Sequence, residues 1–237
     1  MSTFLLVHGA WLGGWFWGRV RNELHDAQQN VFAPTLTGLG ERAHLLRPDI
    51  GLDAHLQDVL SVIEYEALHR VILVTHGYAG MLAGMLAARL PKKFHHVVYL
   101  DAVVPQDGET FCDVIGPEHA RSLQESSAQG GEGWRVPFST PLESWGITSE
   151  VDVRWTNYRM TPHPWKTMTD KARIEAAAPS APWTFVRCVK PANPRIETSA
   201  QRARAAGWRY HELAAGHAAP VTAPRELARL LLAIHDE

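Results

Sequence analysis

Three turns in this sequence combine glycine with residues that could take part in chemistry. They span residues 8–14 (HGAWLGG), 75–80 (THGYAG) and 214–220 (AAGHAAP). Glycine allows backbone N–H groups to converge on one oxygen atom, and a histidine such as His217 can act as a general base. Turns of this kind, brought together, would suit a reaction at a carbonyl carbon.

The first turn is a candidate oxyanion hole. We expect the backbone N–H of Ala10 to be a donor, with His8 and Trp11 lining the same site. A glycine-rich phosphate loop is the competing interpretation, but the patterns GxGxxG and GxxxxGK[ST] are both absent. A tight turn that only joins a strand to a helix is the other alternative.

The segments around these turns alternate between expected strands and expected helices. Short apolar or β-prone runs predict strands at residues 3–7, 30–34, 70–75, 95–100, 183–186 and 208–213. Strands that alternate with helices predict an α/β fold with a doubly wound, mainly parallel sheet. The three turns would then meet at the carboxyl ends of the strands, where such sheets bind ligands.

The alternation stops between residues 105 and 182, where Gly, Ser and Pro are frequent and four tryptophans occur. Because a structureless loop of this length is rare in a compact domain, we expect a mostly helical lid insertion at 105–182. Residues 1–104 and 183–237 would form the core of a single domain. Trp134 and Trp155 are expected to bind substrate, with packing inside the lid as the alternative.

The whole chain resembles the α/β-hydrolase-fold superfamily, in particular its branch of small carboxylesterases, methyl esterases and hydroxynitrile lyases. The resemblance rests on the motifs HGAWxGGWxW, TxxGLGER, HxYxG and VYLDAxVPxDGE, and on a Gly-His pair before the last expected helix. It is weakest in residues 105–182. It implies the α/β-hydrolase fold, a small hydrophobic or aromatic ester, lactone or related carbonyl substrate, and no cofactor.

The sequence departs from this family at the expected nucleophile. The resemblance aligns Gly77 with the serine of the G-x-S-x-G elbow, Thr75 with its first glycine and Gly80 with its last. Removal of a serine by design and natural loss would both give this sequence, and Thr75 favours natural loss. The resemblance assigns a second oxyanion N–H to Tyr78, while His76 would contact the substrate or pack beneath the elbow.

The resemblance also implies that His217 is the catalytic histidine. No carboxylate follows the expected strand 183–186 until Glu197, so we expect Asp101, at the end of strand 95–100, to orient His217. A backbone carbonyl or a water molecule is the alternative partner of the imidazole.

Without a serine, His217 would activate water directly and hydrolyse an ester or lactone. Two other functions stay open. His217 could instead remove a proton in a lyase or cyclase reaction, or the protein could bind a small aromatic ligand without turning it over.

The composition argues against several other classes of protein. A formal net charge of −2 and the lack of any basic block argue against a nucleic-acid partner. Cys112 and Cys188 lie far apart and form neither a zinc pattern nor a disulfide framework, so no metal is expected. No apolar run approaches the roughly 18 residues of a membrane span, and the N-terminus does not read as a signal peptide. We expect a cytoplasmic protein with a small-molecule substrate, and a homodimer remains open.

Overall fold

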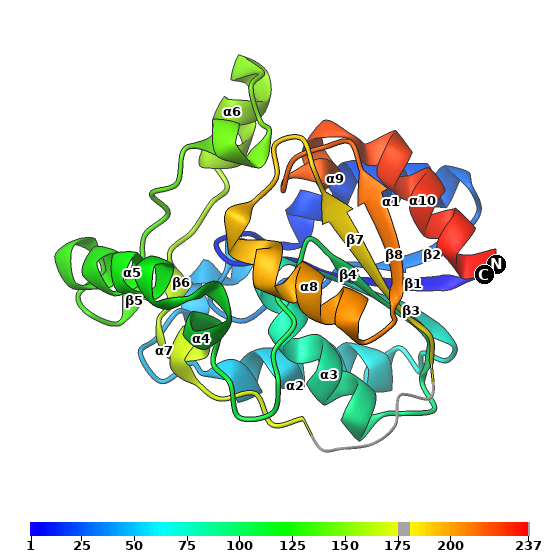
Figure 1. Cartoon of the computed structure of the whole chain (residues 1–237), viewed down its shortest axis with the longest axis horizontal. Coiled ribbons are helices and arrows are strands. Elements are labelled where there is room, and N and C mark those ends of the chain that lie inside the picture. The colour runs from blue at the N-terminus through cyan, green and yellow to red at the C-terminus, as the bar shows by residue number, and fades with distance from the viewer. Residues whose placement is uncertain (175–180, 237) are drawn as a thin grey trace.

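The central element of the fold is a six-stranded parallel sheet, seen in a computed structural model of the chain (Figure 1). The structure describes residues 1–174 and 181–236. The strands are β1 (Thr3–Val7), β2 (Asn30–Phe32), β3 (Val71–His76), β4 (Phe94–Leu100), β7 (Trp183–Cys188) and β8 (Arg209–Leu213). Their spatial order is β2-β1-β3-β4-β7-β8, and every pairing is parallel. The predicted α/β fold with a doubly wound sheet is confirmed.

Burial of both faces of the sheet explains why its central strands are apolar runs. Every residue of β3 is buried, and so is every residue of β1 after Thr3. The predicted strand 3–7 coincides with β1, and the predictions 70–75 and 95–100 lie within one residue of β3 and β4. The shorter β2 ends before Pro34, which cannot donate a hydrogen bond to a neighbouring strand.

Helices cover both faces of the sheet (Figure 1). On one face, α1 (Gly18–Asp26) packs against α10 (Pro224–Asp236), and α2 (Leu52–Tyr65), α3 (Gly80–Arg89) and α8 (Glu197–Ala205) lie on the other. Shorter helical turns connect these layers: η1 (Gly14–Trp17), η2 (Gly40–Leu45), η3 (Gly77–Ala79), η5 (Pro194–Ile196) and α9 (Ala219–Thr222).

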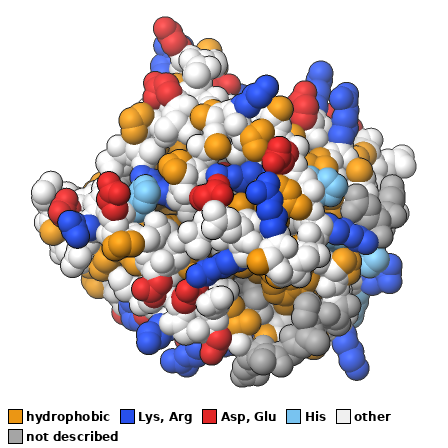
Figure 2. All heavy atoms as spheres, in the orientation of Figure 1, with side chains coloured by type: hydrophobic (Ala, Val, Ile, Leu, Met, Phe, Trp, Pro, Cys, Tyr) orange, Lys and Arg blue, Asp and Glu red, His pale blue; other side chains and the backbone are white. Residues whose placement is uncertain are grey.

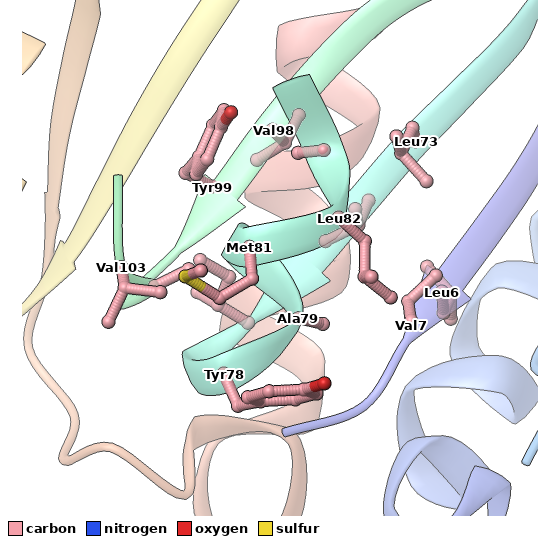
Figure 3. Close-up of a cluster of buried hydrophobic side chains, with 14 of the residues drawn as sticks. Leu6, Val7, Leu73, Tyr78, Ala79, Met81, Leu82, Val98, Tyr99 and Val103 are labelled. Atoms are coloured by element: carbon pink, nitrogen blue, oxygen red, sulfur yellow. The ribbon is translucent and has the colours of Figure 1, made fainter. Parts of the chain in front are cut away.

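The first turn of α3 is fixed by the core. Figure 3 shows Met81 and Leu82 in one cluster with Leu6 of β1 and with Val103, which follows β4. All four side chains are fully buried. Burying a side chain of this size contributes roughly 1.5–3 kcal/mol, so the bend between β3 and α3 is held by packing beneath it.

Most of the remaining helices lie between β4 and β7. They are α4 (Phe111–Ile115), α5 (Pro117–Gly130), η4 (Leu142–Trp145), α6 (Glu150–Asn157) and α7 (Lys166–Thr169). The antiparallel pair β5 (Arg135–Val136) and β6 (His163–Pro164) was not expected from the sequence. In Figure 1, α5 and α6 project away from the sheet. Residues 175–180 of the predicted lid 105–182 lie outside the described residues; residues 105–174 are called the insertion below.

The surface carries both signs of charge. Acidic and basic side chains are interspersed over the face shown in Figure 2. Among the helices of residues 1–174 and 181–236, none combines the length and the apolar character that crossing a bilayer would require.

Gly80 is a position where the fold should tolerate no side chain. A Cβ atom there would overlap the backbone carbonyl oxygen of Val103. We expect Gly80→Ala to lower the free energy of unfolding by about 2 kcal/mol, because the overlap is with backbone in a packed core. Urea unfolding followed by tryptophan fluorescence measures this change.

The matched control is Gly18→Ala at the start of α1, where a Cβ would meet no atom within 4 Å. Its stability should equal or slightly exceed that of the parent. Equal stabilities of the Gly80→Ala and Gly18→Ala variants would contradict the tight approach of α3 to Val103.

Candidate active site

A small cavity lies at the carboxyl ends of β1 and β3. Its volume is about 40 Å³. Its walls come from the three glycine-containing turns, the insertion and the segment after β7: Gly9, Ala10, Trp11, Leu12, Gly77, Tyr78, Phe111, Ile115, Leu123, Trp145, Asn193, Arg195, Ile196 and His217. The structure therefore brings Ala10, Gly77, Tyr78 and His217 to one place.

His217 and Asp101 form a buried hydrogen-bonded pair. Nδ1 of His217 lies 2.8 Å from Oδ2 of Asp101. The other carboxylate oxygen accepts hydrogen bonds from the backbone N–H of Cys188 (3.1 Å) and from the Arg187 guanidinium (3.4 Å). Because a carboxylate only accepts hydrogen bonds, Nδ1 carries the imidazole proton and Nε2 is free to accept one.

His217 is held on its other sides as well. Nε2 of His76 donates to the backbone oxygen of His217 over 2.8 Å, and the two rings lie 4.3 Å apart. The Trp145 indole packs against the imidazole at a centroid distance of 4.9 Å. The backbone oxygen of Trp145 also accepts from the N–H of Ala218 over 2.9 Å. Together these contacts hold the imidazole in a single orientation, in which Nε2 faces Gly77.

Gly77 forms the bend between β3 and α3. Its φ of +54° is in the left-handed region that favours glycine. A Cβ atom at this position would lie 3.2 Å from Nε2 of His217. The backbone oxygen of Gly77 accepts from the N–H of Val103 over 3.0 Å. Thr75 is accommodated inside β3, where its hydroxyl donates to the Val98 carbonyl over 3.4 Å.

Trp11 joins the first turn to the insertion. Its backbone has a φ of +64°. Its indole N–H donates to the Val136 carbonyl of β5 over 2.9 Å, and its own carbonyl accepts from the N–H of Thr161 over 3.1 Å. Trp11 is also one of the residues that line the cavity. Trp11 therefore both lines the site and attaches the insertion to it.

Two of the histidines that the sequence suggested as substrate contacts lie behind the cavity instead. His8 is fully buried; its Nδ1 donates to the Gly9 carbonyl over 2.8 Å, and its Nε2 accepts from the N–H of Leu36 over 3.0 Å. His76 packs beneath the bend and against His217. Both positions orient the turns, and neither residue forms part of the cavity wall.

Two of the tryptophans that the sequence suggested also lie elsewhere. The Trp134 indole N–H donates to the Glu132 carboxylate over 3.2 Å, and the Arg135 guanidinium lies over the indole ring. Trp155 packs edge-on against Trp15 at 5.0 Å. The tryptophan of the insertion that reaches the cavity is Trp145, which the sequence analysis did not select. Nothing in the spacing of the tryptophans distinguishes it from the others.

A second buried network fixes the position of the Tyr78 hydroxyl. Nε2 of His55 donates to the Thr37 carbonyl over 2.9 Å, so Nδ1 of His55 accepts from the Tyr78 hydroxyl over 3.0 Å. Burial lowers the pKa of His55 to about 4, and likewise that of His8. Among the described residues, no group of three or more His, Cys, Asp or Glu side chains is arranged to hold a metal ion.

Comparison with known proteins identifies the family. The model of the Alpha/beta hydrolase family matches residues 4–230. The chain belongs to this family. Over 261 residues, this α/β-hydrolase is 33% identical to the carbendazim hydrolyzing esterase of Nocardioides sp. (strain SG-4G), covering 99% of this chain and 100% of that protein. Its homologues thus include an esterase.

Two further comparisons agree with this assignment. Salicylic acid-binding protein 2 of Nicotiana tabacum is 32% identical over 141 residues, which cover 59% of this α/β-hydrolase and 53% of the tobacco protein. The solved structure of an extracellular alpha/beta-hydrolase from a Paenibacillus species superposes with a TM-score of 0.87 at 20% identity, covering 98% of both chains. The fold of the two proteins is the same.

The buried imidazoles predict a loss of stability in mild acid. His8 and His55 have an ordinary pKa of 6.5 when unfolded and of about 4 when folded. The unfolded chain therefore binds protons first as the pH falls. Stability is highest above about pH 6.5 and declines toward about pH 4, by up to about 3 kcal/mol for each imidazole. Urea unfolding at a series of pH values measures the slope.

The variant His55→Gln should reduce this slope, whereas Gln57→Ala, at an exposed position without a titratable group on the same helix α2, should leave it unchanged. An unfolding free energy that does not fall between about pH 6.5 and about pH 4 would contradict the neutral, buried state of these imidazoles.

Proposed function

We propose that this protein hydrolyses small esters or lactones with a water molecule activated by His217. One observation carries the proposal: Nε2 of His217, oriented by Asp101, faces Gly77 inside the cavity that Ala10 and Tyr78 also line. A general base, a site for the reacting carbonyl and two backbone N–H groups are the parts that such a reaction needs. The esterase among the relatives supports the same class of substrate.

Gly77 takes the position of the serine nucleophile in this proposal. Glycine has no side chain that could form an acyl-enzyme. The described residues of the cavity wall include no Ser, Thr or Cys that could act as the nucleophile instead. Attack by water, without a covalent intermediate, is the route that these residues favour.

The proposed reaction has two proton transfers. Nε2 of His217 takes a proton from water as the water oxygen attacks the carbonyl carbon, and the N–H groups of Ala10 and Tyr78 stabilise the resulting oxyanion. When the tetrahedral intermediate collapses, the imidazolium returns the proton to the departing alkoxide. Asp101 stabilises the imidazolium between the two transfers.

The size of the cavity limits the acyl group. A volume of about 40 Å³ holds only a few atoms, so acetyl and similar groups fit better than long acyl chains. General-base help contributes about 10²–10⁴-fold and an oxyanion donor about 10²–10³-fold. We therefore expect slow hydrolysis of short-chain esters.

The first test is hydrolysis of p-nitrophenyl acetate. We expect steady turnover without a burst, and a fall of about 10²–10⁴-fold in kcat/KM in His217→Ala because the general base is lost. Asp101→Asn should lower the rate as well, through the orientation of the imidazole. The control His69→Ala, at an exposed position, should retain the parent activity.

A serine-directed organophosphonate should leave the parent protein unlabelled. Stoichiometric labelling that disappears in His217→Ala would reveal another nucleophile and would contradict direct attack by water.

A second test restores a hydroxyl at the bend. Gly77→Ser would place a nucleophile beside Nε2 of His217, at a Cβ position 3.2 Å from that atom. We expect p-nitrophenyl acetate to give a burst of p-nitrophenol and a covalent acetyl group detectable by mass spectrometry. Because Thr75 already fits within β3, the additional change Thr75→Gly should bring little further gain.

The control is Gly207→Ser, which also has a positive φ, of +69°, but lies in open surroundings away from the cavity. It should show no burst. Failure of Gly77→Ser to form an acyl group, with the folded structure intact, would mean that the bend does not present a side chain to His217 as proposed.

A second candidate function uses the same base without hydrolysis. The lack of Ser, Thr and Cys among the described residues of the cavity wall also suits removal of a proton from a carbon next to a carbonyl, a lyase or cyclase step, or ligand binding alone. Mass spectrometry of small molecules that co-purify with the protein separates these cases. A ligand that is recovered unchanged after incubation favours binding, and an isomerised or cleaved ligand favours catalysis.

A further inference from the structure

Arg195 brings a cation to the wall of the cavity that contains His217. It belongs to η5, in the segment after β7, and its backbone N–H donates to Oδ1 of Asn193 over 3.1 Å. The Asn193 side chain thus fixes the start of this turn. The guanidinium is half-buried, and its hydrogen bond to the Thr140 hydroxyl is long, at 3.5 Å.

The Arg195 guanidinium has no acidic partner in the part of the chain that the structure describes. Neighbouring Arg187 shows the contrast: it contacts Asp101 and Glu197, each at 3.4 Å, and the Asn193 carbonyl at 3.0 Å. Burial lowers the pKa of Arg195, because desolvation disfavours its charge. A charge removed from water is normally compensated by an opposite charge. Arg195 is therefore a candidate to be paired by a ligand.

Arg195 also lies where two hollows adjoin. The second hollow has a volume of about 240 Å³ and shares Trp145, Asn193 and Arg195 with the cavity that contains His217. Arg195 thus lies within reach of a ligand in either hollow. Trp145 is a lining residue of both hollows and offers an apolar surface beside Arg195.

We propose that Arg195 binds a carboxylate on the substrate, so that the preferred substrates are small esters or lactones that also carry a carboxylate on an apolar or aromatic body. This inference rests on the proposed function. The cavity wall holds one guanidinium and, among its described residues, neither Lys nor an acidic side chain. A single planar guanidinium matches a carboxylate monoanion, with its two parallel hydrogen bonds.

The binding test uses a pair of unreactive ligands. The first ligand, 4-acetamidobenzoate, has an acetyl group in place of the acyl group of the substrate and a carboxylate that Arg195 could bind. The second ligand, 4-acetamidobenzamide, has the same shape but a neutral amide in place of the carboxylate. We expect the parent protein to bind the acid at least about tenfold more tightly than the amide, measured by isothermal titration calorimetry. Added salt should reduce this ratio.

The variant Arg195→Gln should bring the ratio of the two affinities to about one, while Arg121→Gln, at an exposed position on α5, should keep the parent ratio. Thermal unfolding of both variants checks that they are folded. Equal affinities for acid and amide in the parent protein, or a preference that survives Arg195→Gln, would overturn the proposal.

Turnover separates this proposal from the hydrolysis itself. The esters 4-acetoxybenzoate and 4-acetoxybenzamide differ in the same way as the two ligands, and we expect the acid to have the lower KM. Arg195-dependent binding without hydrolysis of either ester would overturn the proposed function and support the carboxylate site. Hydrolysis that depends on His217, with the same KM for both esters, would overturn the carboxylate site alone.

Discussion

The hydrogen bond between Asp101 and His217 sets the strictest requirement on this fold. It joins the end of β4 to the loop after β8 across the intervening β7. The N–H of Cys188, at the end of β7, fixes the second oxygen of the carboxylate. All three strands must therefore end at the same level, which parallel pairing in the order β4-β7-β8 achieves. A shift of one residue in either pairing would separate the two side chains.

The insertion completes the site by contacts with two of the turns. Trp11 bonds with Val136 and Thr161 through its side chain and backbone, and Trp145 contacts both His217 and Ala218. Gly216 allows the second contact, since a Cβ there would collide with the Trp145 backbone. The insertion thereby closes part of the cavity, with Phe111, Ile115, Leu123 and Trp145 among the lining residues.

The sequence predicts the sheet well and the cavity wall less well, for a physical reason. Strands buried on both faces must be apolar, so β1, β3 and β4 are visible as short runs. Asp101 could be expected beside His217 because strand ends converge at one edge of a parallel sheet. The insertion has no comparable period, so nothing in its sequence selects Trp145 over Trp134. Arg195 reaches the cavity because of the path that the segment after β7 takes. No local sequence pattern predicts that path.

The bend at Gly77 is maintained by its neighbours and not by a side chain of its own. The Val103 N–H holds its carbonyl, and buried Met81 and Leu82 anchor the helix that follows. At a φ of +54° most residues with a side chain cost about 1–2 kcal/mol relative to glycine. Glycine is thus the occupant that makes the folded chain most stable. A larger residue at this bend would have to be held in a strained backbone conformation by the packing around it, so the position is cheap to keep as glycine and costly to change.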